Sequence, residues 1–229
     1  MEQKETGNQL ETETNTVEPQ EKQKEPKTAK QEPLPQLKLF NRYAFDVEVK
    51  DAGLRRVISL EPIIIPKSSG RLSQQRLGRA KVDIVERLIT HLLVPGHKGK
   101  KHLRTSKLSS GRFYTAFNVV NEAFELIEKD GKNPVEVLVR AIEHSAPREE
   151  VMNLLIAGQR IAKQVDTSPM RRVDLALRWI AEGTFQSSFS GKKANTALYD
   201  TLMGAYNNSD TAFPISKRIE VERQAASSR

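Results

Sequence analysis

The stretch HKGKKHLRTSKLSSGR, residues 97–112, gathers side chains that could bind phosphate. It holds six Lys or Arg, two His and no acidic residue, and it would suit a linker, a nucleotide-binding loop or a nucleic-acid contact. A phosphate-binding Walker loop needs four residues between its glycines and a Ser or Thr after its Lys. Here only two residues separate Gly96 from Gly99, and Lys101 follows Lys100. The spacing therefore excludes a nucleotide-binding loop.

The sequence shows none of the residue patterns that catalysis or metal binding would need. The chain has no cysteine, which excludes disulfides, thiolate metal sites and a cysteine nucleophile. No two histidines form an i, i+4 pair and no HExxH motif occurs. The four histidines are His91, His97, His102 and His144. We expect no catalytic residue, no metal, no cofactor and no enzymatic activity.

Two acid-free basic runs, 67–81 and 97–112, bracket one predicted helix. Between the first and last Lys or Arg of this region, twelve such residues face only Asp83 and Glu86, a net charge of +10 in a chain of +8. A basic field this concentrated attracts polyanions, and each cation that neutralises a phosphate releases a condensed counterion. We predict nucleic-acid contacts from Lys67, Arg71, Arg76, Arg79, Lys81, Lys98, Lys100, Lys101, Arg104, Lys107 and Arg112. Neither run contains an aromatic residue, so we expect folded RNA or duplex DNA rather than base stacking.

Residues 149–166, EEVMNLLIAGQRIAKQVD, carry part of a second basic set. Two β-rich apolar runs flank Gly158, and the pattern is compatible with a helix or with a β-hairpin. Glycine at the turn favours the hairpin. On a hairpin, Arg160 and Lys163 would lie on an exposed ribbon, an element that can enter a nucleic-acid groove. The rest of this set is Arg171, Arg172 and Arg178.

Beyond the first basic run the sequence shows mainly helical periodicity. The predicted helices must therefore position the basic runs and the segment 149–166. Apolar residues recur at helical spacing over 82–93, before a Pro-Gly pair ends the pattern. A stripe beginning at Phe113 predicts a long amphipathic helix that ends at Gly131. Further helices are predicted to begin at Asn133-Pro134 and Ser168-Pro169 and to cover about 193–206 and 214–227.

Composition divides the 229 residues into three parts. Residues 1–36 hold five Lys against eight Glu and little that is apolar, and we expect a disordered polar tail. Residues 37–66 are more apolar, and VISLEPIIIP (57–66) predicts an extended segment that packs on the core. Residues 67–229 form the predicted helical domain.

Membrane and export signals are missing from the pattern. No apolar run reaches the ~18 residues that cross a bilayer. The N-terminus is acidic and lacks the apolar region of a signal peptide. We therefore expect a soluble cytoplasmic protein that makes no membrane contact.

Several blocks of the sequence follow one another in an order that is typical of a known protein family. Gly99-Lys100-Lys101 precedes a long helix, and NPVEVLVRAIEH (133–144), the segment around Gly158 and SPMRRVDLALRWI (168–180) follow. AYNN (205–208) and KRIEVERQAASSR (217–229) close the chain. Together these blocks resemble the universal small-subunit ribosomal protein seven family in its archaeal form. The resemblance covers roughly 57–229, and its specificity lies in RRVDLALRW and NPVEVLVRAIEH.

The resemblance implies a mainly α fold, with a core of about six helices and a protruding two-stranded arm at about 150–166. It implies a structural component of the small ribosomal subunit, a primary binder of the rRNA 3′ major domain that starts assembly of the head. The arm would reach the exit-tRNA site near the mRNA exit channel, and neighbouring head proteins would be further partners. Carried over by position, the basic contacts are Lys100, Lys101, Arg160, Lys163, Arg171, Arg172 and Arg178, with Trp179 in the core.

Two other classes of protein compete with this interpretation. A free helical DNA-binding regulator would need a base-reading recognition helix and a dimer face, and neither is evident. An enzyme acting on RNA would need a general base or a metal cluster inside the basic field. Only Asp83 and Glu86 lie there, three residues apart on a predicted helix, and we expect them to be ordinary helix-surface charges.

Overall fold

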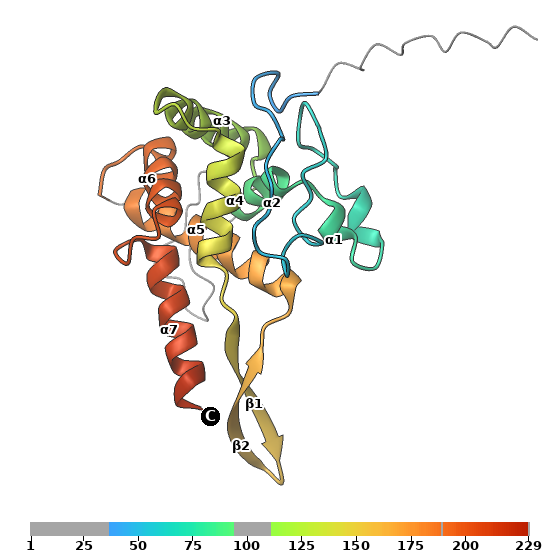
Figure 1. The fold of residues 1–229 in the computed structure, drawn as a ribbon, viewed down its shortest axis with the longest axis vertical. Helices are drawn as coiled ribbons and strands as arrows, with labels where there is room; N and C mark the ends of the chain where they lie inside the picture. Colours follow the sequence, from blue (N-terminus) through green and yellow to red (C-terminus); the bar gives the residue numbers. More distant parts are fainter. Residues whose placement is uncertain (1–36, 94–110, 189, 229) are drawn as a thin grey trace, which may run out of the picture. The chain divides into compact units, whose positions relative to one another are not determined.

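Helices account for more than half of the described residues of the computed structural model, which are 37–93, 111–188 and 190–228 (Figure 1). A 3-10 turn, η1 (Arg71–Gln74), precedes α1 (Gly78–Lys81), α2 (Ile84–Leu92), α3 (Phe113–Lys129) and α4 (Pro134–Ser145). The strands β1 (Glu149–Ile156) and β2 (Gln159–Asp166) follow, and then α5 (Pro169–Ser188), α6 (Ala194–Tyr206) and α7 (Phe213–Ser227). The prediction of a mainly α fold with a hairpin arm is confirmed.

Polar caps define where two of the predicted helices begin. The Asp83 carboxylate accepts hydrogen bonds from the backbone N–H groups of Val85 and Glu86, at 2.9 and 3.3 Å. The helix expected from residue 82 therefore begins at Ile84, because the cap itself has extended backbone. The Asn133 side chain accepts from the Val135 N–H at 3.1 Å, with proline at the first helical position of α4.

The core forms where α6 packs against α3, α4, α5 and α7. The stripe predicted on α3 is buried, with Val120, Phe124 and Ile127 fully inaccessible to solvent. Trp179 of α5 is 7% exposed, as expected for a core residue. α2 packs against α3 and α5 at the other side of this core, so the segment that holds the first basic run joins the bundle through α2.

The segment before η1 covers the helices without forming a sheet of its own. Leu39, Tyr43 and Leu54 are buried in the common core. The stretch 57–66 is predicted to lie extended on the core. Ile58 and Pro66, near its two ends, are buried, whereas Ile65 between them is 58% exposed. Within the described residues this stretch pairs with another segment only through one parallel β-bridge, between Ser59 and Asp83. Two prolines interrupt the stretch, and a proline cannot donate a backbone hydrogen bond to a strand.

Residues 149–166 form a β-hairpin and not a helix, the two elements with which their sequence pattern is compatible. The strands pair antiparallel from Glu149↔Asp166 to Ile156↔Gln159. Ala157 and Gly158 make the turn with φ of 51° and 82°, the left-handed pair that two-residue hairpins use. α7 packs against both strands near their base, and the tip extends beyond the helices (Figure 1).

No helix in the described ranges is long and apolar enough to cross a membrane. The predicted disordered tail, 1–36, and the predicted contacts Lys98, Lys100, Lys101, Arg104 and Lys107 lie outside the described residues.

Candidate nucleic-acid interface

The first basic run lies on the surface around η1 and α1. Lys67, Arg71, Arg76 and Lys81 are exposed and make no ion pair with any described residue. Their positive charge therefore faces solvent uncompensated, which is the condition that favours contact with phosphate.

A buried carboxylate anchors the start of this run. The Glu86 side chain, on α2, accepts hydrogen bonds from the Ser68 backbone N–H at 2.8 Å and from the Ser68 hydroxyl at 2.7 Å. Glu86 is only 9% exposed, so the anchor is shielded from water. The bonds fix the backbone next to Lys67 and give that lysine a defined place beside α2. Glu86 thus has a positioning role. Both acids of the basic field are buried, Asp83 at 1% and Glu86 at 9% exposure, so the expectation of ordinary helix-surface charges is wrong.

Arg79, the fifth cation of the run, is partly committed to Asp174 of α5. Its two terminal nitrogens each lie 3.2 Å from a carboxylate oxygen of Asp174, although the arginine side chain remains 58% exposed. Arg87 of α2 reaches the same carboxylate at 2.9 Å and donates to the Val57 carbonyl at 3.0 Å. Burial raises the pKa of Asp174, but hydrogen bonds from His91 and Arg87 outweigh burial and lower that pKa to about 2. The charged cluster ties α1 and α2 to α5.

A pocket of about 260 Å³ opens beside this cluster, lined by Arg79, Glu86, Arg87 and His91 among others. Its two arginines face Glu86 and the nearby Asp174, so its formal charges balance. All four charged groups already have hydrogen-bond partners in the protein. We therefore assign this pocket to the packing of α1, α2 and α5. In the described residues no group of three or more His, Asp or Glu could hold a metal ion.

Among the cations of the second basic run, only Arg112 lies within the described residues. Arg112 is exposed and directly precedes α3. Next to it, the Gly111 N–H donates to the Leu93 carbonyl at 3.0 Å. The described residues on either side of the run are therefore hydrogen-bonded to each other, and Arg112 emerges beside the C-terminal end of α2.

The three arginines predicted on α5 have different surroundings. Arg171 is exposed and lies 2.7 Å from Glu150 at the base of the hairpin. Arg172 points inward: it contacts Asp51 at 2.7 Å and the Pro147 carbonyl at 3.1 Å, and its side chain is 11% exposed. Arg172 is predicted to contact nucleic acid, and in the structure its guanidinium joins α5 to the N-terminal segment.

Arg178, the third of them, is half-buried. Its Nε is shielded from solvent and has no hydrogen-bond partner among the described residues. Of the arginines in this block, Arg171 alone presents a guanidinium largely to solvent. Arg172 points about 100° away from it around the helix, whereas Arg178, seven residues on, lies on nearly the same side as Arg171 but is half-buried.

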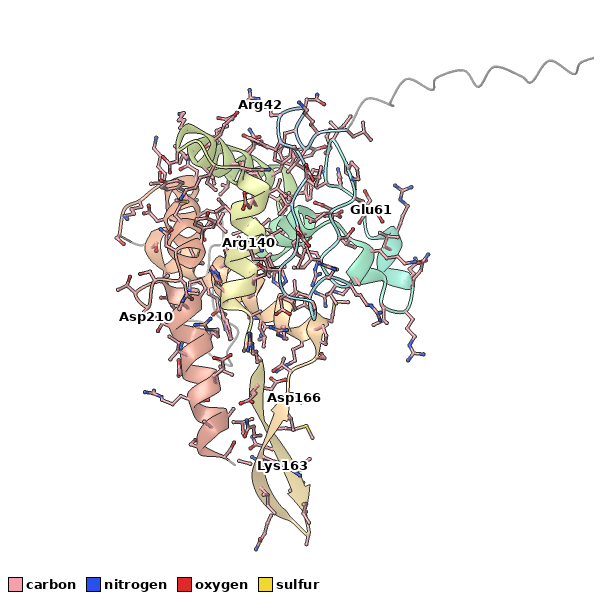
Figure 2. All side chains as sticks on the ribbon, in the orientation of Figure 1. Arg42, Glu61, Arg140, Lys163, Asp166 and Asp210 are labelled. Carbon is pink, nitrogen blue, oxygen red and sulfur yellow. The ribbon has the colours of Figure 1, made fainter. Side chains whose placement is uncertain are left out.

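The hairpin presents its two predicted cations on opposite faces. Arg160 pairs with Leu155 near the tip, and Lys163 pairs with Met152 further down. Side chains alternate between the faces of a strand, so Arg160 shares the face of Ala162, which lines a groove beside α7, and Lys163 lies on the other face. Figure 2 shows Lys163 part-way along the hairpin, level with the C-terminal end of α7, and Asp166 closer to its base. The ribbon can therefore offer a cation to either side.

Comparison with known proteins identifies the relatives of this chain. The model of the ribosomal protein S7p/S5e family matches residues 54–229. The small ribosomal subunit protein uS7 of Nanoarchaeum equitans is 44% identical over 196 residues, which cover 84% of this chain and 99% of that protein. The proteins of the same name from Archaeoglobus fulgidus and Cenarchaeum symbiosum are each 41% identical, covering 85% and 84% of this chain and 96% and 97% of their own lengths.

Proposed function

This chain belongs to the ribosomal protein S7p/S5e family, and on that premise we propose that it is a structural, rRNA-binding component of the small ribosomal subunit. The resemblance inferred from the sequence blocks is thereby confirmed. The relatives carry the names of ribosomal proteins and not of enzymes, in agreement with the prediction that the chain is not an enzyme.

Within that role, the protein binds the 3′ major domain of the small-subunit rRNA as a primary binder and starts assembly of the head. The observation that carries this proposal is the uncompensated charge of Lys67, Arg71, Arg76 and Lys81, on a surface that Glu86 and Asp174 hold to the helical core. Arg112 extends the same surface from the start of α3. A rigid cationic surface without a catalytic group suits phosphate contacts that fix the orientation of an RNA.

The hairpin arm extends this role toward the exit-tRNA site and the mRNA exit channel. Its support is the ribbon itself, whose tip extends beyond the helices (Figure 1) and which carries Arg160 and Lys163 on opposite faces. An arm of this kind can contact two strands or two molecules at once. Other head proteins, exit-site tRNA and mRNA are the proposed partners in the assembled ribosome.

Sedimentation and footprinting test the main proposal. In a low-salt gradient the protein should travel with small subunits, and with a 3′ major domain fragment it should protect a defined set of nucleotides from hydroxyl radicals. Protein that remains at the top of the gradient and protects no nucleotide would overturn the assignment.

The arm can be tested separately because the chain contains no cysteine. A single cysteine introduced by Lys163→Cys or Arg160→Cys can carry a tethered iron chelate that cleaves nearby nucleic acid. We expect cleavage of exit-site tRNA and of rRNA around that site. Cleavage confined to rRNA far from the exit site would contradict the placement of the arm and leave the rRNA-binding role intact.

A further inference from the structure

Tyr114 is the one aromatic side chain of the described residues that lies largely in solvent. It is 71% exposed, whereas the other described aromatic side chains are buried or half-buried. It is the second residue of α3 and follows Arg112 and Phe113. An exposed ring of this size gains little from folding, so its position invites a ligand.

The ring packs against an aromatic neighbour that is itself held by the core. Phe113 meets it edge-on, with ring centroids 6.1 Å apart and planes at 85°, and Phe113 itself stacks on Phe117 at 6.3 Å. Both phenylalanines pack against the hydrophobic core. Tyr114 is therefore a firm platform and not a loosely attached side chain.

A cation of the first basic run shares this platform. The Lys67 ammonium lies 5.0 Å from the centroid of the Tyr114 ring and 5.3 Å from that of Phe113, within the range of cation–π attraction. The bonds between Ser68 and Glu86 hold the neighbouring backbone of Lys67. The fold thus brings the first basic run to the end of the second, where Arg112 adds another exposed cation.

We propose that Tyr114 stacks on an unpaired base of the small-subunit rRNA, while Lys67 and Arg112 bind the phosphates that flank that base. This inference rests on the proposed rRNA-binding function and adds a single-stranded element to it. Any base offers a π-face to an aromatic ring, and the two cations match the charge of a phosphodiester chain. A duplex cannot supply the stacking, because its bases are already stacked on one another. A protein partner would need carboxylates to face Lys67 and Arg112.

The sequence alone pointed away from stacking, because neither basic run contains an aromatic residue. Tyr114 lies just beyond the second run and far along the chain from Lys67. The tertiary contact between these two residues therefore supplies what the sequence pattern lacked.

The experiment compares the full-length protein with Tyr114→Leu and Tyr114→Phe variants in binding to the 3′ major domain fragment across a salt series. We expect Tyr114→Leu to weaken binding at least about fivefold and Tyr114→Phe to stay within about twofold of wild type, since only the ring is needed for stacking. The slope of affinity against salt should not change, because neither variant removes a charge. Ultraviolet crosslinking should join residue 114 to an unpaired nucleotide.

The outcomes separate the inference from the function on which it rests. Equal affinity of Tyr114→Leu and wild type would overturn the stacking while rRNA binding stands, and so would a crosslink that maps only to paired nucleotides. A wild-type protein that fails to bind the fragment would overturn the rRNA-binding function and the inference together. Thermal unfolding of each variant checks the fold, which we expect to be unchanged because the side chain is exposed.

Discussion

The guanidinium of Arg172 lies 2.7 Å from the carboxylate of Asp51, which is 121 positions earlier in the chain. The contact joins the N-terminal segment to α5, and it is sheltered, with 11% of the arginine side chain and 26% of the aspartate side chain exposed. Asp51 also accepts from the Gly53 N–H at 2.8 Å, and its own N–H donates to Glu143 of α4 at 3.0 Å. One ion pair thus connects three parts of the fold.

Arg172→Ala should destabilise the protein by about 2 kcal/mol or more, because it leaves Asp51 without its charge partner in a partly buried place. Urea unfolding followed by circular dichroism measures the free energy of unfolding. Arg171→Ala is the matched control: its pair with Glu150 is exposed on the arginine side and should be worth at most about 1 kcal/mol. Equal losses in the two variants would contradict a structural role for Arg172.

Asp83 should make the protein less stable as pH rises through the neutral range. Its carboxyl is 1% exposed, and burial raises its pKa to about 7 in spite of the N–H groups of Val85 and Glu86. The unfolded chain loses this proton near pH 4 and the folded chain near pH 7, so stability falls between those values. Asp83→Asn keeps the cap acceptor without the titration. Relative to wild type, this variant should gain about 2 kcal/mol between pH 5 and pH 8. A constant difference would show that Asp83 is already ionised in the fold at pH 5.

Asp174 should act in the opposite direction, at acidic pH. Its pKa of about 2 in the fold lies below its ordinary value of 3.8. The stability that it contributes is therefore complete above pH 4 and is lost as pH falls toward 2. Asp174→Asn should cost about 2–3 kcal/mol at pH 7, since Arg87 is buried beside it. We expect that cost to shrink by about 1 kcal/mol between pH 5 and pH 3. A cost that does not depend on pH would mean that the arginines do not favour the ionised form.

Replacing Arg71, Arg76 and Lys81 with Ala should weaken binding to the 3′ major domain fragment and flatten its salt dependence. Each phosphate contact removed lowers the slope of log K against log salt by about 0.7–0.9. Filter binding at four or more salt concentrations measures that slope. The matched control replaces three other exposed lysines that make no ion pair with a described residue, Lys50, Lys129 and Lys193, with Ala. A control with the same loss of slope would indicate an effect of net charge and not of a specific surface.

The second basic run should contribute independently of the first. Replacing Lys98, Lys100, Lys101, Arg104 and Lys107 with Ala should again weaken rRNA binding and flatten the slope. The melting temperature should remain that of wild type, because the charges are expected to serve the RNA and not the core. An unchanged slope would identify this run as a solvated insertion.

Local signals were sufficient to predict most of the helices. The apolar stripe of α3, the Asn133-Pro134 start of α4 and the Ser168-Pro169 start of α5 act within a few residues of the chain, and the structure contains all three. The hairpin was harder to predict, because short apolar runs suit a helix or a strand equally. The left-handed backbone at Ala157 and Gly158 forms together with the pairing of β1 and β2. That pairing joins residues that are not neighbours in the chain, so a local pattern does not determine it.

The candidate interface, like the fold, combines properties that the local sequence determines with properties that depend on tertiary packing. Sequence by itself determined that the chain concentrates positive charge in two runs, contains no cysteine and folds mainly into helices, since charge and periodicity are local properties. Only the tertiary structure decided which cations are free. Adjacent arginines differ because a helix turns about 100° per residue, so Arg171 faces solvent while Arg172 faces Asp51. Likewise, Lys67 and Tyr114 meet only because α2 and α3 pack together, a contact between distant segments that no local pattern encodes.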